Sequence, residues 1–125
     1  MNILTKVCKL RNQLIQWPKG QAALNVIADF QELRECSFPD VIGCVDGTHI
    51  AISAPKNEKA AYLTKKQFSS VILQAVCDSK LVILDGFAGW PGSSHDGRVW
   101  GNSPLYLLIS RNAANMHTRT SPYSR

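Results

Sequence analysis

The chain has 125 residues, a length typical of one domain, and 45% of them are hydrophobic, which is enough for a core and too much for a disordered chain. No run approaches the roughly 18 consecutive apolar residues of a membrane-spanning helix, and the first residues alternate apolar with polar or basic side chains. We therefore expect neither a membrane protein nor a secretory signal. The net charge of +5 favours a polyanionic partner, and no acidic residue follows Asp96.

The cysteines lack the spacing of a metal site, because no two form a C-x-x-C pair and none has a histidine at a zinc-like distance. A disulfide framework would need a secretory context, which is not expected here. We therefore expect reduced and mostly buried thiols. The cysteines are Cys8, Cys36, Cys44 and Cys77.

Two helices are expected at the start of the chain, at 3–15 and 21–35, because apolar residues recur there at helical spacing. The sequence "WPKG" at 17–20 separates them, and Pro39 ends the second by disfavouring helical geometry at the residue before it. Together they form a predicted N-terminal helical segment at 1–38.

The period of the apolar pattern changes after residue 40. Apolar and β-branched runs predict strands at 41–53, 69–78 and 80–89, the first of them buried and either continuous or bent at Gly47. The last two strands are separated by a short turn, so we expect an antiparallel meander. Several N-cap candidates then predict a short helix through 98–100.

Two acidic residues stand out as candidate metal ligands. Asp46 follows the apolar start of the first strand, where a carboxylate offers a hard oxygen to Mg²⁺ or Mn²⁺. The alternative is that Asp46 is an ordinary β-turn residue within "DGT". Asp96 in "SSHDG" presents a similar choice between a metal ligand and a helix cap. A Ser-His-Asp triad is excluded there, because adjacent residues point in different directions and the spacing of a nucleophile elbow is absent.

Three motifs taken together resemble the PIF/Harbinger-type transposase family, which includes the Harbinger transposase-derived nucleases of the DDE endonuclease superfamily. They are "CVDGTHIAISAP" at 44–55, "QAVCD" at 74–78 and "GWPGSSHDGRVW" at 89–100, the last followed by "NSPL". The similarity runs from about Trp17 to about Leu107. It rests on the order and spacing of the three motifs, because "DGT" alone is common in turns.

The resemblance implies an α+β chain that forms the N-terminal portion of an RNase H-like fold, in which a three-stranded antiparallel sheet comes first. Asp46 corresponds to the acid of the family's "DGTH" motif and Asp96 to that of its "HD" motif, both implied to be catalytic and to bind metal. The implied activity is metal-dependent cleavage or joining of DNA, with two Mg²⁺ or Mn²⁺ ions roughly 3.5–4 Å apart. A basic connection would meet the DNA phosphates or would be an ordinary solvated loop. Its lysines are Lys56, Lys59, Lys65 and Lys66.

The chain also departs from the family pattern, which continues to a further Asp in "D-S-x-[YF]" and a final Glu, and which begins with a DNA-binding region. Residues 39–109 are therefore expected to be a partial DDE nuclease domain that is inactive by itself. Residues 110–125 lack periodicity and are expected to be a disordered or aberrant tail. The alternatives are a non-catalytic fragment of a domesticated transposase that binds DNA or protein, and a gene fragment without a stable function. The resemblance further implies a nuclear or cytoplasmic location and a separate DNA-binding partner protein.

Overall fold

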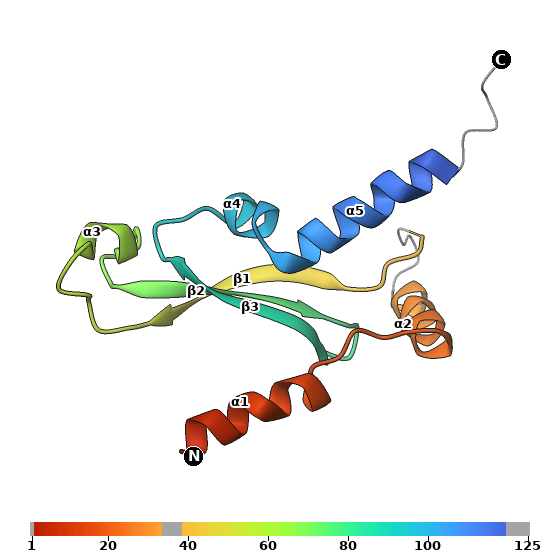
Figure 1. The fold of residues 1–125 in the computed structure, drawn as a ribbon, viewed down its shortest axis with the longest axis horizontal. Coiled ribbons are helices and arrows are strands. Elements are labelled where there is room, and N and C mark those ends of the chain that lie inside the picture. The colour runs from red at the N-terminus through yellow and green to blue at the C-terminus, as the bar shows by residue number, and fades with distance from the viewer. Residues whose placement is uncertain (1, 34–38, 120–125) are drawn as a thin grey trace. The chain divides into compact units, whose positions relative to one another are not determined.

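The computed structural model of the protein describes residues 2–33 and 39–119, the side chains of 113–119 excepted. The elements in these residues are α1 (Ile3–Leu14), α2 (Gln21–Glu32), β1 (Cys44–Ala51), α3 (Lys59–Tyr62), β2 (Ser70–Cys77), β3 (Ile83–Pro91), α4 (Asp96–Gly101) and α5 (Pro104–Arg119) (Figure 1). The chain divides into two compact units. The first is Met1–His49 with Leu73–Ala88, and the second is Ile50–Ile72 with Gly89–Arg125.

The three strands form one antiparallel sheet in the order β1-β2-β3, so β2 is the central strand (Figure 1). The side chains of β2 alternate between buried and half-buried, as expected for a strand with a neighbour on each side. The predicted antiparallel meander is therefore confirmed. This mixed α+β architecture agrees with the N-terminal portion of an RNase H-like fold.

β1 corrects the prediction that the first strand is buried. It runs without a break, yet every residue except the half-buried Gly47 is exposed. The reason is its place at the edge of the sheet, where β2 is its one neighbour among the described strands. An apolar run predicts that a strand forms, but the same run occurs in central and in edge strands.

The two predicted N-terminal helices are confirmed as α1 and α2, which end at Leu14 and Glu32. The predicted end of the second helix at residue 35 lies outside the described residues. Asn2 caps α1 by accepting a hydrogen bond at 2.8 Å from the backbone N–H of Thr5. Among the described residues, no helix has the length and apolar character needed to cross a membrane.

Side chains attach both N-terminal helices to the hairpin of β2 and β3 within the first unit. The Arg11 guanidinium on α1 donates a hydrogen bond to the Gly86 carbonyl at 2.8 Å. Lys80 in the hairpin loop forms an ion pair with Asp29 on α2, with 2.9 Å between Nζ and Oδ2. Both contacts involve a charged donor, which makes them stronger than hydrogen bonds between neutral groups.

The loop between β2 and β3 is longer than the short turn predicted between the strands at 69–78 and 80–89. Asp78 organises it, because its Oδ1 accepts hydrogen bonds from the backbone N–H groups of Lys80 and Val82 at 2.8 and 2.9 Å. Leu81 adopts a left-handed backbone with φ of 63°. β3 therefore begins later along the chain than the sequence predicted.

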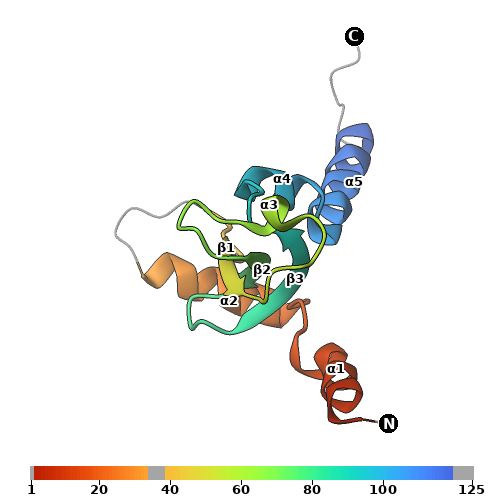
Figure 2. The same cartoon turned by 90° about the vertical axis from the view of Figure 1, so that its left-hand side faces the viewer.

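The predicted short helix is confirmed as α4, but the prediction of disorder after residue 110 is wrong as far as Arg119, where α5 ends. No glycine or proline interrupts the chain between Pro104 and Arg119, so a helix that starts there can propagate. Almost no large apolar residues follow Ile109, which explains why apolar periodicity gave no signal there. α5 lies beside α4 in both views (Figures 1 and 2).

The cysteines are less buried than expected. Cys8 and Cys44 are exposed and Cys77 is half-buried, and all three are free thiols. Cys36 lies outside the described residues. The expectation of mostly buried thiols is therefore wrong for the two exposed ones, because they lie on a surface helix and on an edge strand.

Candidate metal and nucleic-acid site

Asp46 is an exposed residue in the middle of β1. Because the strand is continuous through Gly47, the alternative of a β-turn at "DGT" is wrong. The Asp46 Oδ1 accepts a hydrogen bond at 2.8 Å from the backbone N–H of Gly47, which restricts the carboxylate's rotation. The sheet thus presents a carboxylate to solvent on a regular backbone.

Asp96 is also exposed and is the first residue of α4. The N-cap position belongs to His95, whose backbone is extended, and no side-chain hydrogen bond caps the helix. The alternative that the Asp96 side chain caps α4 is therefore wrong. A negative charge in the first turn nevertheless stabilises a helix through the helix dipole, so Asp96 has a modest structural role whatever else it does.

The turn that leads to Asp96 is held by Gly92. Its backbone N–H donates to the Ser70 carbonyl at 2.9 Å, and the next residue donates to the Ala61 carbonyl at 3.2 Å. A Cβ built on Gly92 would meet Ser70 Oγ and would lie 2.9 Å from the carbonyl oxygens of Ser70 and Tyr62. Since real Cβ atoms essentially never come so close to backbone, only glycine fits, and the motif "PGSS" has a structural reason.

The "NSPL" motif forms the junction of α4 and α5. Asn102 Nδ2 donates to the Arg98 carbonyl at 2.8 Å near the end of α4. Ser103 is fully buried, and its Oγ accepts a hydrogen bond at 3.1 Å from the backbone N–H of Tyr106, which makes it the N-cap of α5. Pro104 follows at the first helical position, where proline is favoured. The motif therefore fixes the direction of the chain after α4.

The four lysines of the basic connection are all exposed. Two of them lie in an ordered loop that the sequence did not predict. Thr64 is buried, and its Oγ1 accepts hydrogen bonds from the backbone N–H groups of Lys66 and Phe68 at 3.2 and 3.4 Å. A hydrogen bond at 2.9 Å from the N–H of Thr64 to the Phe68 carbonyl closes this loop. Lys65 and Lys66 thus project from a braced loop, whereas Lys59 begins α3.

The chemistry of the candidate metal ligands fits a magnesium-type ion. Asp46 belongs to the first unit and Asp96 to the second. Within residues 2–33 and 39–119, no group of three histidine, cysteine or acidic side chains is placed to hold a metal. Mg²⁺ typically takes only one or two protein carboxylates and completes its shell with water and substrate phosphates. An exposed carboxylate is therefore a suitable protein contribution, and a closed protein cage is not required.

Comparison with protein families now identifies the class. The sequence profile of the DDE superfamily endonuclease family matches residues 45–121, more than half of the chain. The chain belongs to this family, as its motifs predicted. The match includes both candidate acids and extends beyond Ile109 into the segment expected to be a disordered or aberrant tail.

Individual relatives support the same assignment. The chain is 32% identical over 117 residues to the human protein named "Putative nuclease HARBI1", covering 93% of this chain and 32% of the relative. The rat protein of that name is 33% identical over 105 residues, covering 83% and 30%. The "Protein ALP1-like" of Arabidopsis thaliana is 39% identical over 99 residues, covering 78% and 23%. The chain thus spans about a third or less of these relatives. No solved structure matches it.

Proposed function

We propose that Asp46 and Asp96 are metal-binding, catalytic carboxylates of a DDE-type nuclease that breaks phosphodiester bonds in DNA. The observation that carries this proposal is the exposed Asp46 on the first strand of the antiparallel sheet, within the region that matches the endonuclease family. A carboxylate in an unbroken strand has no turn to stabilise. Its exposure leaves it available to an ion.

Phosphodiester cleavage needs positive charge, because the substrate is anionic and repels a nucleophile. A bound Mg²⁺ or Mn²⁺ would supply this charge and activate the attacking water or hydroxyl. The contribution of the chain is to orient its carboxylates. The Gly47 N–H restricts Asp46, and the close approach of Gly92 to Ser70 fixes the turn that leads to Asp96.

The braced loop of Thr64 to Phe68 supports DNA as the substrate. Lys65 and Lys66 are exposed at neighbouring positions and can approach successive phosphates of a backbone. Lys56 and Lys59 extend the same basic segment.

Each lysine that contacts a phosphate of duplex DNA should add about 0.9 to the slope of log affinity against log salt. Lys65→Ala should reduce this slope by that amount, and Lys80→Ala, which removes a lysine that is already paired with Asp29, should not.

Metal-dependent DNA binding tests the proposal. Mn²⁺ held by these carboxylates would attract the DNA phosphates and should raise the affinity for duplex DNA. Asp46→Asn or Asp96→Asn should reduce or abolish this increment while leaving metal-free binding at least as strong. Asp40→Asn is the matched control, since Asp40 is exposed, lies outside the matched region and has a left-handed backbone (φ 59°) that asparagine tolerates. An equal Mn²⁺ increment in all three variants would reject both acids as ligands.

A non-catalytic DNA-binding role is the second candidate, and the exposed lysines favour it. It predicts affinity that falls steeply with salt and does not respond to Mn²⁺. The same assay therefore separates the two functions.

We further propose that the protein is located in the nucleus, which imaging of a fluorescent fusion would check. We also propose that it acts with a separate DNA-binding partner protein, which affinity purification from nuclear extract would seek.

A further inference from the structure

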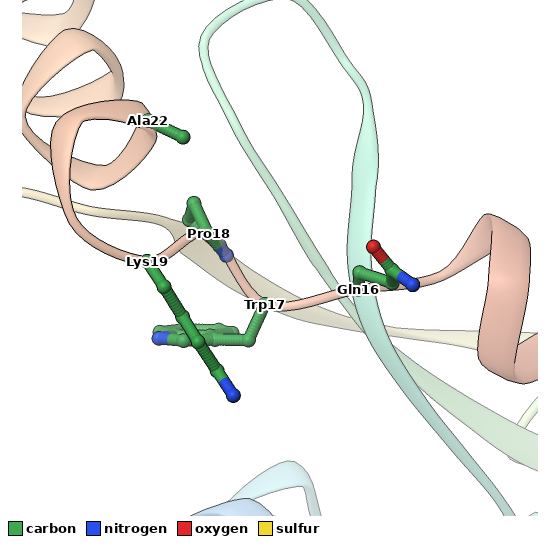
Figure 3. A pocket seen from close by; sticks show the side chains of 5 residues that line it. All are labelled: Gln16, Trp17, Pro18, Lys19 and Ala22. Atoms are coloured by element: carbon green, nitrogen blue, oxygen red, sulfur yellow. The ribbon is translucent and has the colours of Figure 1, made fainter.

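A cavity lies in the loop between α1 and α2, within the first unit and apart from both candidate acids (Figure 3). Its volume is about 600 Å³, which is within the usual range of small-ligand sites. It is lined by Gln16, Trp17, Pro18, Lys19 and Ala22. In the sequence this loop is the helix-separating "WPKG", to which no function was assigned.

The lining offers a ligand an aromatic surface and a positive charge. Trp17 is half-buried and offers a flat aromatic surface, and Lys19 is exposed and offers a positive charge. Figure 3 shows both side chains extending from the loop toward the same side. Gln16 also lines the cavity, but its amide nitrogen donates to the Asn12 carbonyl at 3.0 Å. An aromatic ring beside a cation suits a ligand that is itself aromatic and anionic.

The charge of the N-terminal segment that contains the cavity favours such a ligand. The chain contains no acidic residue before Asp29, whereas Lys6, Lys9, Arg11 and Lys19 precede it. Asp29 forms an ion pair with Lys80, and none of the carboxylates in the described residues lines the cavity. In addition, α2 begins at Gln21 without a side-chain cap, so the positive end of its dipole adds to the attraction of an anion.

We propose that this cavity binds a nucleotide of single-stranded DNA, with the base stacked on Trp17 and the phosphate paired with Lys19. A base can enter a cavity only when it is out of the duplex stack, so the site should distinguish single strands from duplexes. The site uses none of the residues of the proposed metal-dependent function and holds or fails independently of it.

The test is the affinity of the full chain for a dye-labelled oligothymidylate of about six nucleotides, measured by fluorescence anisotropy with EDTA present. Trp17→Ala should weaken binding about tenfold, and Trp17→Phe, which keeps an aromatic face, should weaken it less. An abasic strand of equal length should bind the wild-type chain about as weakly as the oligothymidylate binds Trp17→Ala. Equal affinity for the abasic and thymidine strands would overturn the proposal.

Lys19→Ala provides a second test that leaves the half-buried tryptophan in place. It should lower the affinity several-fold more than Lys6→Ala, which removes the same charge from an exposed position on α1. Equal losses in the two variants would mean that Lys19 acts only through net charge, and would overturn the site. Competition by an acidic or proline-rich peptide at lower concentrations than the oligonucleotide would also overturn it, in favour of a peptide ligand.

Discussion

The two candidate acids are held in opposite ways. Asp46 lies on an exposed edge strand whose backbone is supported on one side by β2, with a single local hydrogen bond from Gly47 to its carboxylate. Asp96 follows a turn that packs against Ser70 and Tyr62, and it begins a helix whose Val99 is fully buried. One acid is thus presented by a regular but open strand, and the other by an irregular but tightly packed turn.

This difference predicts where mutations will act. In the turn before Asp96, the geometry depends on a few close backbone contacts at Gly92, so a single added atom there should be costly. Around Asp46, the side chains are exposed, and substitutions should change association and ligand binding more than stability. Experiments can therefore test whether mutations near Asp96 mainly lower stability while mutations near Asp46 mainly change association and ligand binding.

The largest effect is expected for Gly92→Ala. The new Cβ would lie 2.9 Å from two carbonyl oxygens, and backbone cannot move aside cheaply. We expect a loss of about 2–4 kcal/mol in the free energy of unfolding, measured by urea denaturation. Gly97→Ala is the control, because its Cβ would meet nothing and alanine favours the helix, so stability should stay equal or rise by about 0.5 kcal/mol. Similar values for both variants would contradict the packed-turn account.

Ser103→Ala should have the second-largest effect. It removes the N-cap of α5 and leaves the backbone N–H of Tyr106 without this acceptor. The expected loss is about 1–2 kcal/mol in urea denaturation. Ser110→Ala on the exposed surface of α5 is the matched control and should change stability by less than about 0.5 kcal/mol. A loss for Ser110→Ala as large as that for Ser103→Ala would argue against the cap.

The edge position of β1 predicts self-association. Val45 is 46% exposed on a strand with one described neighbour, and such edges pair readily with other chains. Val45→Lys should lower the mass measured by light scattering while changing stability by less than about 0.5 kcal/mol. Val82→Lys makes the same change at a site 52% exposed in the hairpin loop, and should leave the mass unchanged. A wild-type chain that is monomeric at high concentration would disprove this prediction.

The smallest effect concerns the ion pair between Lys80 and Asp29. The hydrogen bond that Lys80 donates to the Asp29 carboxylate, followed by the negative charge of Asp29, raises the pKa of Lys80 above the ordinary value of 10.5. A raised lysine pKa stabilises the folded state at all pH values below 10.5, and this contribution disappears as the pH rises through the raised pKa. Asp29→Asn should return the pKa of Lys80 toward 10.5 in an NMR titration. An unchanged pKa would show that the pair does not persist in solution.

The sequence predicted α1, α2 and the three strands because apolar periodicity reflects local geometry, but it missed α3 and assigned most of α5 to a disordered or aberrant tail. It predicted the meander for the same reason. Burial of β1 was wrong, since the place of a strand in a sheet depends on its neighbours rather than on its own residues. The exposure of Cys44 follows from the same edge position.

Other features depended on single side chains that periodicity does not report. The Asp78 carboxylate accepts backbone hydrogen bonds that hold a longer hairpin loop, and the Thr64 hydroxyl does the same for the basic loop. The Ser103 hydroxyl caps the helix that continues to Arg119. The candidate acids stood out from their local sequence, but only the three motifs together implied a catalytic role for them. The cavity at Trp17 was missed because a loop of mixed residues gives no sign that it encloses space.

Direct measurement of Mn²⁺ binding tests whether Asp46 and Asp96 are metal ligands. Calorimetric titration of the wild-type chain without DNA should show binding that is weakened at least about tenfold by Asp46→Asn and by Asp96→Asn, because each removes a charged oxygen ligand. Asp40→Asn should bind as the wild type does. Mn²⁺ binding that is the same in all four proteins would contradict the assignment of Asp46 and Asp96 as metal ligands.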